Sequence, residues 1–139
     1  MSSQYISRSF EETVRYGYTL GESLAGGEVL LLNGVLGSGK TALAKGIAAA
    51  IGVSEVVTSP SFAIMNEYTG RLFLYHFDFY RIDDEAEMED LLGDFAYRED
   101  AIIVIEWGER LTERLGSCMI IGITLQGSER LISVTRRLA

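Results

Sequence analysis

The sequence contains few of the residues that build disulfides, zinc sites and flexible linkers. Cys118 is the only cysteine and His76 the only histidine among 139 residues. An internal disulfide is therefore impossible, and a zinc site, which needs three or four clustered ligands, is not expected. Pro60 is the only proline, and no repeat or low-complexity tract interrupts the chain. The composition predicts one globular domain over residues 1–139.

Basic residues are also scarce, and long apolar runs are absent. Lys and Arg number 12 against 20 Asp and Glu, which gives a formal net charge of −8. Nucleic-acid binding rests on clustered basic side chains, so we expect any nucleic acid to be held by a partner. The amino-terminal residues lack the apolar segment of a signal peptide, and no run approaches the roughly 20 residues that cross a bilayer. These absences predict a cytoplasmic protein with no membrane association.

Hydrophobic periodicity predicts helices and strands in alternation. Ser9 and Glu12 have capping-box spacing, and a helical pattern follows them until residues 26–27, which are both glycine. The runs "EVLLLNG" and "AIIVIEWG" are typical of strands buried on both faces. A second helix is expected from Lys40, and a short acidic helix over 83–94.

Two hairpins complete the predicted fold. One turns at "YTGR", and the other, at the carboxyl end, turns at residues 126–129. Hairpins are antiparallel, whereas the fully apolar runs are typical of parallel strands. The expected fold class is therefore a P-loop NTPase-like α/β domain, with a mixed sheet flanked by helices and an antiparallel carboxyl-terminal hairpin.

The segment "GVLGSGKT", residues 34–41, matches the phosphate-binding pattern G-x-x-x-x-G-K-[ST] between a strand and a helix. Gly34, Gly37 and Gly39 let the backbone approach an anion, so that N–H groups and the following helix terminus can surround phosphates. Lys40 is expected to reach the β- and γ-phosphates, and the Thr41 hydroxyl to ligate Mg²⁺. The pattern predicts a nucleoside triphosphate site.

Two carboxylates stand where apolar strands are expected to end, Asp78 in "YHFDFYR" and Glu106 in "IVIEWGE". Hydrolysis at a P-loop needs acidic residues for Mg²⁺ and a positioned water. Such a carboxylate lies at the carboxyl end of a strand beside the P-loop strand, so either residue can serve. Lys40, Asp78 and Glu106 are the candidate catalytic residues. His76, in the same strand as Asp78, is interpreted as a structural histidine.

Other residues near these motifs have two interpretations each. Ser59 and Ser61 flank Pro60 and fit either an ordinary turn or a loop that senses the γ-phosphate. Trp107 either packs in the core or flanks the nucleotide. The acidic run over 83–94 fits a solvated helix face or a surface that meets a basic partner.

In this order and spacing, "GVLGSGKT", "TSPSF", "YHFDFYR" and "IEWGERL", preceded by "SFEETVRYG", resemble the TsaE (YjeE) family over nearly the whole chain. The resemblance implies an ATPase of the bacterial system that makes N6-threonylcarbamoyladenosine (t6A) at position 37 of tRNA. Such proteins bind the TsaB–TsaD pair and hydrolyse ATP with Mg²⁺, weakly when alone, to support TsaD. TsaD performs the transfer itself, and tRNA is reached only through these partners.

The resemblance also implies roles for individual residues. Residues 36–41 would form the phosphate loop, Thr41 and Glu106 would ligate Mg²⁺, and Asp78 would act near the metal or the attacking water. Adenine would lie between Phe10 and Gly127. The complete set of expected nucleotide contacts is Gly34, Leu36, Gly37, Ser38, Gly39, Lys40, Thr41, Phe10 and Gly127. The chain departs from the family pattern at Val35, Ser61 and Gly108, where an acid, threonine and proline are usual.

Three other functions would use the same loop. A small-molecule kinase needs an acceptor pocket and an arginine-bearing lid, and no insertion of that size is present. A GTPase needs an N-K-x-D stretch, which the sequence lacks. A non-hydrolysing adaptor would bind nucleotide only to hold a shape, and the acidic strand ends disfavour it.

Overall fold

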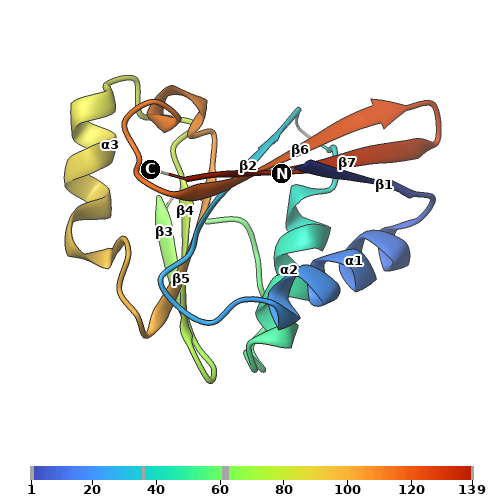
Figure 1. The fold of residues 1–139 in the computed structure, drawn as a ribbon, viewed down its shortest axis with the longest axis horizontal. Helices are drawn as coiled ribbons and strands as arrows, with labels where there is room; N and C mark the ends of the chain where they lie inside the picture. Colours follow the sequence, from blue (N-terminus) through green and yellow to red (C-terminus); the bar gives the residue numbers. More distant parts are fainter. Residues whose placement is uncertain (1, 36, 61–62, 139) are drawn as a thin grey trace.

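A mixed sheet with helices on both faces forms the centre of the molecule (Figure 1). The computed structural model describes residues 2–35, 37–60 and 63–138. Within them the sheet has seven strands in the order β1-β7-β6-β2-β5-β4-β3. The strands are β1 (Ser2–Ser7), β2 (Val29–Gly34), β3 (Met65–Thr69), β4 (Phe73–Asp78), β5 (Ala101–Glu106), β6 (Cys118–Gln126) and β7 (Glu129–Arg137). The helices are α1 (Phe10–Glu22), α2 (Lys40–Ala50) and α3 (Glu85–Leu92), with short 3-10 turns at Gly93–Phe95 and Glu109–Leu111.

The four central strands, β6, β2, β5 and β4, are parallel, and the outer pairings are antiparallel. The predicted mixed sheet is therefore confirmed, and so is the carboxyl-terminal hairpin, in which Gln126 pairs with Glu129. The expected hairpin at "YTGR" is formed by β3 and β4. Strands β2 and β5 lie side by side in the middle, which is why both sequences are almost wholly apolar.

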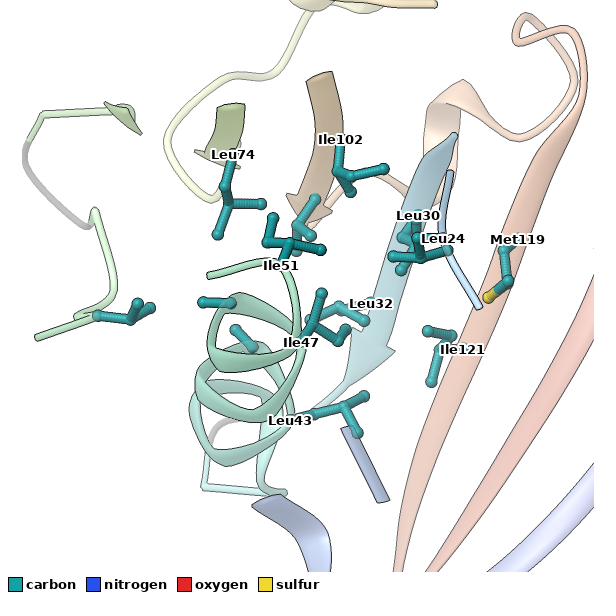
Figure 2. Packing of buried hydrophobic residues seen from close by; sticks show 14 of the residues in the cluster. Leu24, Leu30, Leu32, Leu43, Ile47, Ile51, Leu74, Ile102, Met119 and Ile121 are labelled. Atoms are coloured by element: carbon teal, nitrogen blue, oxygen red, sulfur yellow. The ribbon is translucent and has the colours of Figure 1, made fainter. Parts of the chain in front are cut away.

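Alternate side chains of the central strands enter two separate cores. One core contains Leu30, Leu32, Leu74 and Ile102 from the sheet, packed against Leu43 and Ile47 of α2 and against Ile51, its C-cap residue (Figure 2). The other contains Leu31, Phe77, Ile103 and Ile105, packed against Met88 and Leu92 of α3. Each fully buried Leu, Ile or Phe contributes about 1.5–3 kcal/mol. The two cores fix β2 and β5, and with them the ends of these strands.

Helices α1 and α2 pack side by side on one face of the sheet (Figure 1). Their backbones meet at Gly17 and Gly46: a Cβ atom on Gly46 would lie 2.0 Å from the Val14 carbonyl oxygen. Only residues without side chains permit this approach. This close crossing fixes the position of α1, which begins at Phe10, relative to α2, which begins at Lys40.

Strand β1 and the ends of two helices differ from the prediction, and the acidic helix predicted over 83–94 is the shorter α3. Strand β1 was not predicted, because its sequence "SSQYIS" is mostly polar and exposed; it forms by pairing with the free edge of β7. Helix α1 ends at Glu22, earlier than the glycines at 26–27. The Ser9 cap is confirmed, since its hydroxyl accepts the Glu12 amide hydrogen at 3.1 Å. In the described part of the chain, no helix combines the length and apolar character that a bilayer crossing requires.

Candidate functional site

The P-loop connects β2 to α2. Gly37 and Gly39 have φ values of 80° and 116°, the left-handed region that favours glycine. Gly39 is also the N-cap of α2, and as a glycine it has no side chain to cap the helix. The positive end of the helix dipole favours an anion at this position. Leu36 lies outside the described residues.

Lys40 is buried, with 6% of its surface exposed, and its ammonium group contacts three of the described residues. Nζ donates to the Gly34 carbonyl oxygen at 2.7 Å, lies 4.0 Å from Glu106 Oε1, and sits 4.2 Å from the centre of the Trp107 ring. A phosphate group could replace the Gly34 carbonyl as acceptor. The lysine is thus held at the P-loop by contacts that a ligand would have to displace.

Asp78 and Glu106 occupy paired positions at the carboxyl ends of β4 and β5. Both are buried, with 7% and 4% exposed. The Asp78 carboxylate accepts from the Tyr80 amide at 2.9 Å and from the Ser59 hydroxyl at 3.5 Å. The Phe79 amide donates to the Glu106 carbonyl oxygen at 3.0 Å and joins the two strand ends. Both carboxylates lie at strand ends, as predicted. Only Glu106 is on a strand beside the P-loop strand, because β5 adjoins β2, whereas Asp78 lies one strand further out, on β4.

His76 precedes Asp78 by two residues and lies on the same side of β4. Its Nε2 is 2.6 Å from Glu106 Oε2, and the ring is fully buried. In the sequence its position in an alternating strand suggested only a structural role. The contact with Glu106 depends on the register of β4 against β5, which no local pattern contains.

A cleft of about 720 Å³ joins these groups. Thr41 lines it together with the glycines of the P-loop, and Phe10 contributes from the start of α1, with 56% of its surface exposed. Gly127 does not line the cleft; it lies in the turn between β6 and β7. The lining residues are Phe10, Gly37, Gly39, Lys40, Thr41, Ala42, Ser59, Asp78, Tyr80, Arg81, Glu106, Trp107 and Arg130. Ser38 is fully buried under the loop, and Ser61 lies outside the described residues.

Sequence reasoning missed Arg130 and Tyr80. Arg130, at the start of β7, donates from Nε to the Ser38 carbonyl oxygen at 2.7 Å, across 92 positions of sequence. Tyr80 packs edge-on against Trp107, with ring centres 4.9 Å apart. Trp107 itself has a φ of 59°, rare for a bulky residue. The "FYR" and "EWG" strings were visible signals for Tyr80 and Trp107, whereas nothing local marked Arg130.

The oxygen atoms in the cleft suit Mg²⁺. Thr41 supplies a hydroxyl, and Asp78 and Glu106 supply carboxylates. The described residues include no cluster of three or more His, Cys, Asp or Glu side chains that could hold a metal by themselves. Mg²⁺ commonly binds through one or two carboxylates, with phosphate and water oxygens completing its shell, so this donor set fits.

Comparisons with known proteins identify one family over most of this chain. A family model described as "Threonylcarbamoyl adenosine biosynthesis protein TsaE" matches residues 7–137. The tRNA threonylcarbamoyladenosine biosynthesis protein TsaE of Treponema pallidum is 40% identical over 110 residues, which cover 79% of this chain and 82% of that protein. The protein of the same name from Mycobacterium tuberculosis H37Rv is 43% identical over 117 residues, covering 76% and 68%.

A solved structure has the same fold. The crystal structure of Bacillus subtilis YdiB superposes with a TM-score of 0.82 and 29% sequence identity, covering 98% of this chain and 86% of that one. The family match spans all of the described site, from Phe10 to Arg130. The chain therefore belongs to the TsaE family of threonylcarbamoyladenosine biosynthesis proteins.

Proposed function

We propose that this protein is a Mg²⁺-dependent ATPase that hydrolyses ATP to ADP and phosphate in the P-loop cleft. The observation that carries the proposal is the convergence of Lys40, Asp78 and Glu106 on one cleft beside the start of α2, where the N-cap residue is a glycine. Positioned charges of this kind stabilise the charge that develops during phosphoryl transfer. A glycine-rich turn without a ligand would not need two buried carboxylates and a buried lysine in the same cleft.

Each residue has a role that its position supports. The P-loop amides and Lys40 would bind the phosphates, and Phe10, exposed at the rim, would contact the base. Asp78, held by the Tyr80 amide, would orient the attacking water. Thr41 and Glu106 would hold Mg²⁺, which supplies positive charge to the phosphate oxygens when bound. Gly127 would be the second adenine contact, and to reach the base the turn between β6 and β7 would have to move toward the cleft.

We further propose that hydrolysis supports a TsaB–TsaD pair in t6A formation on tRNA. Membership of the TsaE family is the main support for this partnership. The net charge of −8 agrees with it, because an acidic chain is poorly suited to hold tRNA itself and would leave that contact to the partners. The transfer of the threonylcarbamoyl group would belong to TsaD.

The test is ATP hydrolysis by the purified chain with Mg²⁺, alone and with the TsaB–TsaD pair from the same source. We expect slow release of phosphate to water by the chain alone and clear stimulation by the pair. Equal hydrolysis rates with and without the pair would contradict the proposed partnership. No hydrolysis in either sample would contradict the ATPase proposal. Phosphate found on an added acceptor instead of in water would indicate a kinase, and GTP competing as well as ATP would indicate a GTPase.

Two substitutions test whether Lys40 and Glu106 take part in the proposed reaction. Lys40→Ala should abolish nucleotide-dependent function, and Glu106→Ala should lower the hydrolysis rate by about 10²–10³-fold while the fold is kept. Tyr75→Phe is the matched control, because Tyr75 lies on β4 but enters the opposite core. Parent-like hydrolysis by Glu106→Ala would remove Glu106 from the mechanism.

A further inference from the structure

We propose that His76 is a positioning residue that holds the Glu106 carboxylate in the orientation the cleft requires. The inference deepens the proposed function and rests on it for its catalytic meaning. It starts from a short polar contact between two buried side chains of the site, 2.6 Å between His76 Nε2 and Glu106 Oε2.

The register of the sheet creates this contact. His76 pairs with Val104 across β4 and β5, and Glu106 lies two residues further along β5. Because alternate residues share a face, the two side chains are diagonal neighbours on the side that carries α2. The imidazole spans the diagonal. A shorter side chain at position 76 would not reach the carboxylate.

His76 can act only through Glu106. Its ring has no exposed surface and does not line the cleft, so it cannot touch a nucleotide or water there. The other ring nitrogen, Nδ1, is buried without a hydrogen-bond partner among the described residues. A single proton on Nε2, donated to Glu106, therefore satisfies the polar contact that the ring makes.

The two oxygen atoms of the Glu106 carboxylate have different neighbours. Oε2 is occupied by His76, whereas Oε1 points toward Lys40, with Nζ at 4.0 Å. Opposite charges this deeply buried attract strongly, and two contacts oppose their closing further: Gly34 accepts from Lys40 Nζ at 2.7 Å, and His76 holds Oε2. By holding Oε2, His76 keeps Oε1 available for a ligand and keeps Lys40 available for phosphate. Partners that orient a ligating group in this way commonly change metal affinity or activity by 10–100-fold.

The first experiment uses nuclear magnetic resonance on the full chain with ¹⁵N-labelled histidine and no nucleotide. His76 is the only histidine, so its ring gives one assignable set of signals. We expect the ring proton on Nε2, shifted downfield by the carboxylate, and an upfield move in Glu106→Gln but not in Tyr75→Phe. A ring proton on Nδ1 would overturn the inference, and so would a ring-proton chemical shift that is the same in Glu106→Gln as in the parent.

The second experiment measures ADP affinity by calorimetry over a range of Mg²⁺ concentrations. His76→Leu should reduce the gain in affinity that Mg²⁺ provides by about 10–100-fold, with little change in affinity without Mg²⁺. His76→Gln, whose amide can still donate toward Oε2, should restore most of that gain. In a Glu106→Gln background, His76→Leu should add no further loss, as expected for a residue acting through Glu106.

The outcomes separate this inference from the proposed function. Unchanged Mg²⁺ dependence in His76→Leu, or equal losses in the Leu and Gln variants, would overturn the positioning role. If His76→Leu does not fold, the comparison of the His76 ring-proton shift in the parent and in Glu106→Gln still tests the positioning role. A parent chain that binds Mg²⁺ and ADP but leaves ATP intact would contradict the ATPase proposal alone, since neither readout involves hydrolysis.

Discussion

The crossing of α1 and α2 should make Gly46 one of the least replaceable residues outside the cleft. In Gly46→Ala, the new Cβ would lie 2.0 Å from the Val14 carbonyl oxygen and 2.7 Å from the Tyr18 amide nitrogen. Both are backbone atoms of α1, so no side chain can rotate away, and the helices would have to separate by more than an ångström. Overpacking of this kind costs about 1–3 kcal/mol or more, against about 1 kcal/mol gained in helix propensity.

We therefore expect Gly46→Ala to lower the free energy of unfolding by about 2 kcal/mol, and Tm by roughly 6–10 °C. Urea titration followed by circular dichroism measures this change. Ala49→Gly, on the exposed side of α2, is the matched control and should cost only about 1 kcal/mol from propensity. A Gly46→Ala variant as stable as the parent, or more stable, would refute the close helix contact on which the reasoning depends.

Three further predictions concern the hairpin, the cysteine and a surface ion pair. Arg130→Ala removes the hydrogen bond to the Ser38 carbonyl and should weaken nucleotide binding by roughly tenfold; unchanged affinity in a calorimetric titration would contradict this. Burial raises the pKa of the Cys118 thiol, so iodoacetamide should modify the folded chain slowly below that pKa and the urea-unfolded chain quickly, as mass spectrometry can show; rapid labelling of the folded chain would contradict it. The Arg98 guanidinium lowers the pKa of Asp100, so this pair stabilises the fold above the ordinary Asp pKa and loses its effect as pH falls through the lowered value. The stability difference between the parent and Asp100→Asn should therefore vanish in acid, and a difference that grows as pH falls would reverse the sign of this argument.

The parts of the site that could be predicted from the sequence are those encoded by short contiguous strings. The P-loop depends on glycines and Gly-Lys-Thr within eight residues, and the apolar runs before Asp78 and Glu106 mark strand ends directly. These features follow from local backbone requirements and from burial on both faces. Together with the two hairpins, they were sufficient to predict a mixed sheet with a P-loop and two carboxylates at strand ends.

The parts that could not be predicted depend on pairing between distant segments. The His76–Glu106 contact needs the register of β4 against β5, and Arg130 reaches the P-loop only because the final hairpin folds back beside β2. Strand β1 has little β-forming sequence of its own and is stabilised by the edge of β7. Such contacts depend on how distant strands pair, so they cannot be predicted from the sequence of any single segment.

The charges in the cleft bear on why Mg²⁺ and nucleotide would bind together. Asp78 and Glu106 are both buried in the cleft, and Lys40 Nζ lies 4.0 Å from Glu106. Arg81 and Arg130 also line the cleft and add positive charge, but the Arg130 Nε is already bonded to the Ser38 carbonyl. Without a divalent cation, phosphate would approach carboxylates of the same sign in a poorly solvated site, where repulsion is strong. The same carboxylates that would oppose ATP alone would favour ATP with Mg²⁺, so under the proposed function the cleft distinguishes the complex from the free nucleotide.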